Sequence, residues 1–275
     1  MADTKELAIV RLDESDAAGG LALSTEAGWN QNETDWRFFL TKGIVFGARD
    51  REGLPVATAA LLPYSGTDAW ISMVLVTATH RRRGLATRLV DACLDRATRL
   101  GVTAWLDATP AGAAVYGPLG FQPTIELRRL RLENASSSRP ATPIPAGKID
   151  AFVARDVAAM GFDRRVLLCA LVERPMSRLL ADGDTMALVR DGRTARHIGP
   201  LFADSPEHAL AMVGHIVANE SDQLLIDAVA TQDRFIKGLI DCGWAVERPF
   251  QRMRFGSAAR RADEPPVAVV GPEFG

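Results

Sequence analysis

The fold is decided by one basic stretch, His80-Arg81-Arg82-Arg83-Gly84-Leu85-Ala86-Thr87. It follows the apolar segment Ile71–Val76 and leads into a long amphipathic segment, Leu85–Leu100. This order predicts a strand, a basic turn with one glycine, and a helix. The start of a helix presents free N–H groups and a positive dipole end, and a glycine lets a ligand approach the backbone closely. The stretch therefore indicates a phosphate-binding point or, more simply, a solvated basic turn before a surface helix.

Two common phosphate motifs are missing from the chain. It contains neither the GxxxxGK[ST] loop of nucleotide hydrolases nor the GxGxxG fingerprint of dinucleotide-binding domains. Each of those motifs places several backbone amides around phosphates, so their absence disfavours nucleotide hydrolysis and dinucleotide binding.

A second motif follows the amphipathic helix at a fixed distance. After a predicted buried strand, Val102–Asp107, comes the pattern Ala-x-x-x-x-Tyr-x-x-x-Gly-Phe, which runs from Ala111 through Tyr116 to Phe121. Together with Arg-x-x-Gly-x-Ala in the basic stretch, this pattern resembles the signature of the GNAT superfamily of N-acetyltransferases. Thr109 departs from the family, because many members carry asparagine at that spacing.

The resemblance implies a fold and a donor site. The fold expected is α/β (α+β), a mixed, mostly antiparallel twisted sheet with helices on both faces. Acetyl-CoA is implied as co-substrate, and no metal is expected. Tyr116 would give a proton to the departing thiolate. The residues implied in acetyl-CoA binding are Leu75, Val76 and Thr77 for the pantetheine arm, and Arg81, Arg82, Arg83, Gly84, Leu85, Ala86 and Thr87 for the pyrophosphate.

The acceptor side is less specified. Glu26, Asp35, Asp68 and Asp107 are candidates for the base that deprotonates the acceptor, and a chain of waters is an alternative. Asp107 ends a central strand, where it would act as a catalytic residue or cap the next turn. In similar proteins the first two helices form the acceptor wall, which points to Trp29, Asn30, Gln31 and Trp36. The two tryptophans could equally be core anchors.

The second half of the chain repeats the first. Leu225-Ile226-Asp227-Ala228 echoes Trp105-Leu106-Asp107-Ala108, and Cys242-Gly243-Trp244 echoes Leu119-Gly120-Phe121. The chain therefore resembles a bacterial tandem of two GNAT-like domains. We expect a catalytic domain at 1–133, a Ser/Pro-rich linker at 134–148, a degenerate domain at 149–256 and a tail at 257–275. Phe121–Leu132 would close the first domain and Ala245–Phe255 the second.

The second copy lacks the chemistry of the first. In place of the basic turn stand Ala203-Asp204-Ser205-Pro206-Glu207-His208, and Leu239 aligns with Tyr116. Pro206 removes an amide donor, and the carboxylates would repel a pyrophosphate. We expect this domain to support the first, although a separate ligand site around Asp227 or Arg196 stays open.

Bulk composition narrows the class of protein. The chain has 275 residues, 47% of them hydrophobic, and a formal net charge of -2, which gives no general attraction to nucleic acid or anionic membranes. No segment approaches the roughly 20 apolar residues that span a bilayer, and the first residues lack the features of a signal peptide. We expect a cytoplasmic protein, with a homodimer as an open assembly. Cys93, Cys169 and Cys242 lie in apolar helical patterns and are expected to be buried, reduced thiols.

The favoured function is transfer of an acetyl group from acetyl-CoA to a primary amine of a small molecule. The alternative is a non-catalytic acyl-CoA-binding or regulatory module, and a structural partner protein is a third. An intact Tyr116 and basic turn argue against the binding module, because a protein that only binds needs no general acid. A structural partner would not need the phosphate turn.

Overall fold

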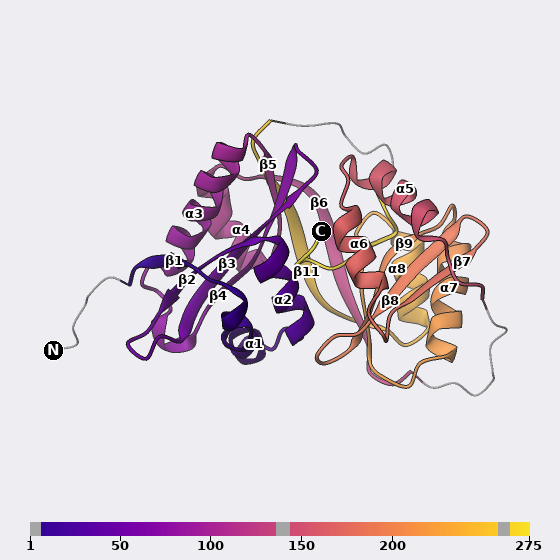
Figure 1. The fold of residues 1–275 in the computed structure, drawn as a ribbon. Helices are drawn as coiled ribbons and strands as arrows, with labels where there is room; N and C mark the ends of the chain where they lie inside the picture. Colours follow the sequence, from indigo (N-terminus) through magenta and orange to yellow (C-terminus); the bar gives the residue numbers. More distant parts are fainter. Residues whose placement is uncertain (1–6, 136–143, 258–264) are drawn as a thin grey trace. The chain divides into compact units, whose positions relative to one another are not determined.

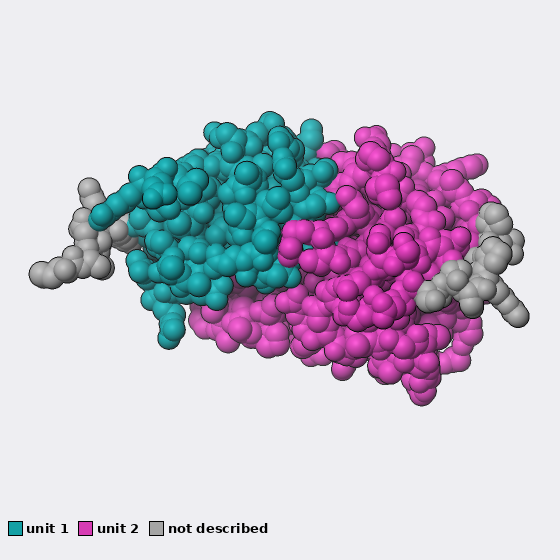
Figure 2. Space-filling model, turned by 90° about the horizontal axis from the view of Figure 1, so that it is seen from below, with its two compact units in different colours: residues 1–105 teal, residues 106–275 magenta. Residues whose placement is uncertain are grey.

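The structure is a computed structural model that describes residues 7–135, 144–257 and 265–275 (Figure 1). The chain divides into two compact units, residues 1–105 and 106–275, which are coloured separately in Figure 2. The boundary falls inside strand β5, so this strand contributes residues to both units. Residues 136–143 of the predicted linker lie outside the described part of the chain.

The first unit holds the predicted strand, basic turn and helix. Its elements are β1 (Ile9–Arg11), η1 (Glu14–Asp16), α1 (Ala17–Glu26), α2 (Glu33–Lys42), β2 (Ile44–Arg49), β3 (Pro55–Tyr64), β4 (Asp68–Val76), η2 (Ala78–His80), α3 (Leu85–Leu100) and β5 (Thr103–Ala108). The strands follow the order β1-β2-β3-β4-β5, antiparallel as far as β4. Strands β4 and β5 are parallel, paired from Asp68↔Thr103 to Trp70↔Trp105.

Local sequence explains the helices of this unit. Helix α2 begins at a capping box, in which the Asn32 side chain accepts from the Asp35 N–H and Asp35 accepts from the Asn32 N–H. Helix α3 buries one face, which includes Leu89, Val90 and Cys93, and it ends at Gly101 in the left-handed conformation. Helices α1 and α2 lie on one face of the sheet and α3 on the other (Figure 1).

The second unit contains the end of the first repeat and all of the second. Its remaining elements are α4 (Pro110–Tyr116), η3 (Gly117–Leu119), β6 (Gln122–Leu132), α5 (Ile149–Met160), α6 (Arg165–Val172), β7 (Arg178–Asp182), β8 (Thr185–Arg190), β9 (Arg196–Phe202), α7 (Pro206–Ala218), β10 (Leu224–Val229), α8 (Asp233–Asp241), β11 (Ala245–Phe255) and β12 (Ala268–Val269). Helices α5 and α6 cover one face of its sheet, and α7 and α8 cover the other (Figure 1).

The two repeats exchange their final strands within this unit. The strand order is β11-β6-β10-β12-β9-β8-β7, and β11 also neighbours β5. Strand β6, the end of the first repeat, is therefore antiparallel to β11 on one side and to β10 on the other. Strand β11, the end of the second repeat, lies between β5 and β6. Each repeat thus supplies the closing strand that sequence order would assign to the other.

The segment expected to be a tail is instead part of the core where the structure describes it. Residues 267–275 include β12, which pairs with both β10 and β9. Val269, Val270 and Phe274 are fully buried. Transfer of these apolar side chains from water into the core of the second unit is favourable. This burial explains why a short, proline-flanked segment is held there.

The fold class agrees with the prediction. The strands form one mixed, mostly antiparallel sheet, and each unit has helices on both faces of its part of that sheet. Among the described residues, no helix combines the length and apolar character needed to cross a membrane.

Candidate functional site

The basic turn has an unusual backbone conformation. Arg82 and Gly84 both have positive φ, 60° and 72°, and they flank Arg83. A Cβ atom at Gly84 would meet nothing within 4 Å. The glycine is therefore favoured by its positive φ and not by lack of space. Alternation of left-handed and ordinary residues turns successive N–H groups toward one side, a geometry that suits an anion.

The first turn of α3 has no side-chain cap. Gly84 is the N-cap residue and offers no side chain, and the first intrahelical bond runs from the Arg88 N–H to the Gly84 carbonyl, 3.1 Å. The amides of Leu85, Ala86 and Thr87 precede that bond and point out of the helix end. The predicted pyrophosphate-binding residues thus bring three amides and the positive helix end to one exposed turn.

Two of the three arginines brace the turn. Nε of Arg81 donates to the Val76 carbonyl at 3.0 Å, and Nη2 of Arg83 donates to the Thr79 carbonyl at 2.9 Å. All three arginines are exposed. Their positive charges therefore surround the helix start while the turn itself is held in place.

Glu26, at the end of α1, fastens the beginning of the turn. Its Oε1 accepts from the Ala78 N–H and its Oε2 from the Thr77 hydroxyl, both at 2.7 Å. These hydrogen bonds lower the pKa of Glu26, the Thr77 hydroxyl contributing most and Arg81 least. The sequence predicts Glu26 only as a candidate base, whereas its contacts make it an anchor between α1 and the segment that follows β4.

Strand β4 is bent just before the predicted pantetheine-binding residues. Its register with β3 shifts between Thr58↔Leu75 and Ala60↔Ser72, and Met73 there has a φ of 53°. The Thr58 hydroxyl donates to the Met73 carbonyl at 2.8 Å and fixes the irregularity. Such a bulge re-aims backbone groups, here at Met73 and Val74, before Leu75 and Val76 resume pairing with β3.

Tyr116 ends α4 in the second unit. Its half-buried ring packs on Phe121, with ring centroids 5.9 Å apart, and Phe121 packs on Phe255 of β11 at 5.6 Å. Thr109, which departs from the family pattern, caps α4 by accepting from the Gly112 N–H at 3.2 Å. A strand of the second repeat therefore helps position the tyrosine of the first.

Asp107 is held in an ion pair rather than presented to solvent. Nε and Nη2 of Arg252 donate to its two carboxylate oxygens at 2.8 and 2.9 Å, and the Asp107 side chain has no exposed area. Burial raises the pKa of Asp107, and Arg252 offsets part of that effect. The contacts fit a positioning role and disfavour the predicted role as a base, because both oxygens are already engaged.

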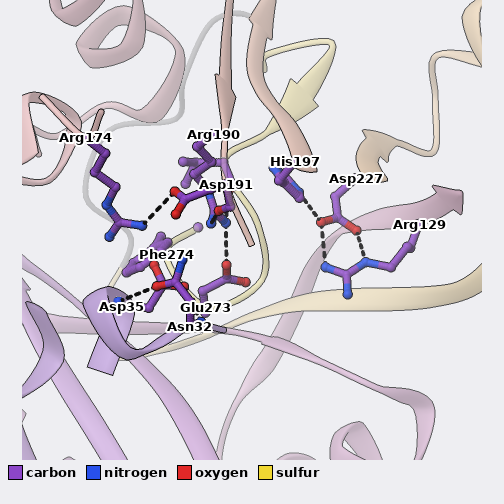
Figure 3. A network of polar contacts seen from close by, with 12 residues as sticks. Asn32, Asp35, Arg129, Arg174, Arg190, Asp191, His197, Asp227, Glu273 and Phe274 are labelled. Atoms are coloured by element: carbon purple, nitrogen blue, oxygen red, sulfur yellow. Dashed lines mark hydrogen bonds and ion pairs between the residues drawn. The ribbon is translucent and has the colours of Figure 1, made fainter. Parts of the chain in front are cut away.

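A matching pair lies at the equivalent place of the second repeat. Arg129 donates through Nε and Nη2 to the two oxygens of Asp227, both at 2.8 Å, and His197 contacts Asp227 at 2.9 Å (Figure 3). Burial opposes ionisation of Asp227, but Arg129 and the His197 hydrogen bond outweigh it and hold the pKa of Asp227 well below its usual range. Arg129 and Arg252 stand at the same spacing after Phe121 and Trp244, a signal in the sequence that would have revealed both.

The predicted acceptor residues divide into two kinds. Trp36 is fully buried, donates from its indole N–H to the Ser24 hydroxyl at 2.9 Å, and packs where any side chain at Gly20 would collide with its ring. It is a core anchor, and its assignment to the acceptor wall is corrected. Trp29 is half-buried, while Asn30 and Gln31 are buried on the connection between α1 and α2.

The other two candidate bases have structural contacts. Asp35 belongs to the capping box of α2. Asp68 stands at the opposite end of β4 from the turn, where it accepts from the Trp105 indole at 2.7 Å and from the Thr67 hydroxyl at 2.6 Å. Neither carboxylate belongs to the region around the basic turn.

The corresponding helix start in the second repeat is closed. Ser205 caps α7 by accepting from the His208 N–H at 3.2 Å, and Pro206 occupies the first helical position. Asp204 and Glu207 form ion pairs with arginines of the same unit. This end is already satisfied by the chain itself, in agreement with the predicted degeneracy.

Metal and thiol chemistry receive no support from the described residues. They contain no group of three or more His, Cys, Asp or Glu side chains that could hold a metal ion. Cys93 is buried, and burial raises the pKa of its thiol, whereas Cys169 is half-buried and Cys242 is exposed at the end of α8. The expectation of three buried thiols is therefore wrong for Cys242.

Comparison with known proteins agrees with this geometry. A family model described as "Acetyltransferase (GNAT) family" matches residues 13–121, and one described as "Acetyltransferase (GNAT) domain" matches residues 153–266. The chain is a tandem GNAT protein. An uncharacterized N-acetyltransferase of Bacillus subtilis, YitH, is 24% identical over 273 residues, covering 94% of this chain and 90% of the relative.

Solved structures share the tandem fold. A protein of Pyrococcus horikoshii classed as an acetyltransferase superposes with a TM-score of 0.80 at 20% identity, covering 98% of this chain and 96% of the other. A tandem GNAT protein from the clavulanic acid biosynthesis pathway gives a TM-score of 0.62 at 17% identity, covering 92% of this chain and all of the other. Family membership makes this tandem GNAT protein an acyltransferase.

Proposed function

We propose that this tandem GNAT protein transfers an acetyl group from acetyl-CoA directly to a primary amine of a small molecule. The observation that carries the proposal is the uncapped start of α3, where open amides and exposed arginines meet at Gly84. A turn that served only to begin a surface helix would be better served by a capping side chain, as at α2 and α7.

The donor fits the first repeat in two places. The amides of Leu85, Ala86 and Thr87, with the charges of Arg81, Arg82 and Arg83, would bind the pyrophosphate through charge-assisted hydrogen bonds. The backbone of Leu75, Val76 and Thr77 would pair with the pantetheine amides as an added strand does. Glu26 supports both, because it ties α1 to Thr77 and Ala78, which lie between β4 and the basic turn.

The chemical step is an exchange of one acyl bond for another. The neutral amine attacks the thioester carbonyl, a C–N bond forms, and the C–S bond breaks with release of the thiolate. Backbone amides beside the β4 bulge would stabilise the developing oxyanion. The Tyr116 hydroxyl would protonate the thiolate, and the Phe121 and Phe255 rings support its position.

Proton loss from the acceptor ammonium proceeds to water in this proposal. Each of the four candidate carboxylates has hydrogen-bond donors already: Glu26, Asp35, Asp68 and Asp107. A carboxylate engaged on both oxygens would have to break those bonds to act as a base. A water chain needs no such rearrangement.

Among the residues predicted to line the acceptor wall, Gln31 is the best candidate for binding the acceptor amine. Its Oε1 is buried and accepts no hydrogen bond from the part of the chain that the structure describes. An unsatisfied buried acceptor costs free energy, which an amine N–H would recover on binding. We therefore place the acceptor amine near Gln31, with Trp29 and Asn30 beside it.

Calorimetry tests the donor site. Wild-type protein should bind acetyl-CoA and CoA with micromolar affinity, and Gly84→Glu should weaken binding about 100-fold, because a carboxylate would stand at the anion site. Gly53→Glu is the matched control, since Gly53 also has positive φ and open surroundings in the same unit; its affinity should stay within about twofold of wild type.

Turnover with a panel of small amines then separates catalysis from binding. Release of free thiol that depends on an added amine supports the proposed transferase. Tight acetyl-CoA binding without turnover on any amine would favour the non-catalytic module, and equal binding by wild type and Gly84→Glu would overturn the donor site.

A further inference from the structure

Strands β9 and β10 of the second repeat diverge in the same way as the first-repeat strands. They begin as a parallel pair, from Arg196↔Leu224 to Ile198↔Ile226. Their first-repeat counterparts pair in parallel from Asp68↔Thr103 to Trp70↔Trp105. In each repeat the parallel pairing covers three residue pairs, and in the second repeat another strand then lies between the diverging strands.

That strand is β12, from the 267–275 segment. Ala268 pairs with Ala228 of β10 and with Leu201 of β9, antiparallel to both. The Val267 N–H donates to the Leu201 carbonyl at 2.9 Å, and the Val267 carbonyl accepts from the Val229 N–H at 3.0 Å. The segment thus uses its backbone to bridge the diverging strands.

The same register irregularity occurs beside the inserted strand. The pairing of β8 with β9 shifts between Ala187↔Leu201 and Val189↔Ile198, which places Gly199 and Pro200 at a bulge like that of β4. Pro200 has no N–H to offer a thioester oxygen. A Cβ at Gly199 would lie 2.0 Å from the Val269 carbonyl oxygen, so the glycine makes room for the segment.

Buried cations hold the rest of the segment. Nη2 of Arg190 donates to the Val270 carbonyl at 3.1 Å and to the Glu273 carboxylate, and its guanidinium lies 5.4 Å from the Phe274 ring centroid (Figure 3). Nη1 of Arg164, whose other nitrogens bind Asp156, donates to the Phe274 carbonyl at 3.0 Å. A segment that only rested on the protein surface would not bind two fully buried arginines.

We propose that the 267–275 segment is a built-in occupant of the cofactor position in the second repeat, lying where an acyl-CoA pantetheine arm would otherwise pair with β9. This inference rests on the proposed function for the comparison with pantetheine, while the occupancy of the second repeat stands on its own contacts. It follows that the full chain binds one acyl-CoA, at the first repeat, and that binding leaves the segment in place.

Hydrogen exchange on the full-length protein tests the occupancy. The amides of Val267 and Val269 should exchange slowly, and saturating acetyl-CoA should not accelerate them. Gly199→Ala should accelerate their exchange at least about tenfold, because its methyl group meets the Val269 carbonyl. Gly183→Ala is the matched control, with positive φ and open surroundings on the same unit, and it should leave the segment unchanged.

A second variant guards against a general folding defect. Glu273→Gln removes the charge that Arg190 binds and keeps its shape, and it should accelerate exchange of the segment without altering acetyl-CoA affinity. Fast exchange of the segment in wild type, or its release by acetyl-CoA, would overturn the proposal.

The number of acetyl-CoA molecules bound per chain is a third test of the proposal. Calorimetry should give one acetyl-CoA per chain, bound about 100-fold more weakly in Gly84→Glu. A second equivalent of acetyl-CoA per chain would overturn the occupancy. Absence of any binding by wild type with slow exchange of the segment would instead refute the proposed donor site and leave the occupancy standing.

Discussion

Helices α3 and α7 occupy equivalent places in the two repeats, yet their starts are opposite in character. Helix α3 begins at Gly84 with open amides and exposed arginines, whereas α7 begins at Ser205 with a capping hydroxyl and at Pro206 with one amide fewer. Asp204 and Glu207 add negative charge at the second start, whereas the stretch from His80 to Thr87 contains no acidic residue. The same fold therefore supports an anion site or a closed cap, depending on a few residues at one helix end.

The strands beside those helices differ in a parallel way. The β4 bulge at Met73 retains its backbone donors, while the β9 bulge contains Pro200 and is covered by β12. In the proposed function a ligand pairs with the first repeat at this place, whereas the second repeat fills the equivalent place with its own chain. The comparison teaches that one position of the fold can be completed either by a ligand or by a strand of the same protein.

The buried ion pair of the second repeat should give the largest effect. Asp227→Ala leaves Arg129 and His197 buried without their carboxylate, so the free energy of unfolding should fall by about 3–5 kcal/mol. Asp107→Ala leaves only Arg252 without its carboxylate, so it should lower the free energy of unfolding by less. Urea unfolding measures the stability of both variants. Equal losses would contradict the predicted difference between the two ion pairs. Replacing Arg129 and Asp227 together by leucine should recover most of the stability.

Tyr116→Phe should produce the next largest effect, on turnover. Loss of the general acid should lower kcat about 100-fold, or about 2.7 kcal/mol, while the acetyl-CoA Kd changes less than about threefold. Leu239→Ala, at the aligned position of the second repeat, should leave the acetyl-CoA Kd unchanged. Steady-state kinetics and calorimetry decide the outcome, and an unchanged kcat in Tyr116→Phe would refute the catalytic role.

Glu26 should have a smaller effect, on binding alone. Glu26→Ala frees Thr77 and Ala78 and should raise the acetyl-CoA Kd about threefold to tenfold. Glu26→Gln keeps an acceptor and removes a negative charge near the pyrophosphate, so it should bind at least as well as wild type. If both variants behaved alike, the anchoring role would be wrong.

The smallest predicted effect is a pH dependence from the second repeat. Burial lowers the pKa of His197 below its usual value, with Arg190 adding to the effect. As pH falls below about 6.5, the unfolded imidazole binds a proton that the folded one resists, so stability present above that pH is lost. His197→Gln should flatten the stability profile between pH 7 and 5. His215→Gln, at a more exposed histidine whose pKa is also lowered, should flatten it less.

The local features of the first repeat were predictable from the chain alone. The basic turn, the α3 helix and the Tyr116 motif each depend on residues close in sequence, where glycine conformation and helical periodicity are decisive. Trp36 shows the limit of that approach, because burial under α1 depends on the packing of Gly20 and Ser24. Residues 149–160 and 178–182 form α5 and β7, two elements that are not among those predicted from the sequence.

The amino-acid sequence by itself determined the repeat, the family and the contrast between a basic and a capped helix start. Only the tertiary structure decided that β6 and β11 exchange places, that Asp107 pairs with Arg252 as Asp227 does with Arg129, and that β12 of the 267–275 segment pairs with β9 and β10. The physical reason is that backbone hydrogen bonds of a strand have no sequence specificity. The choice of partner strand comes from buried side chains contributed by distant parts of the chain.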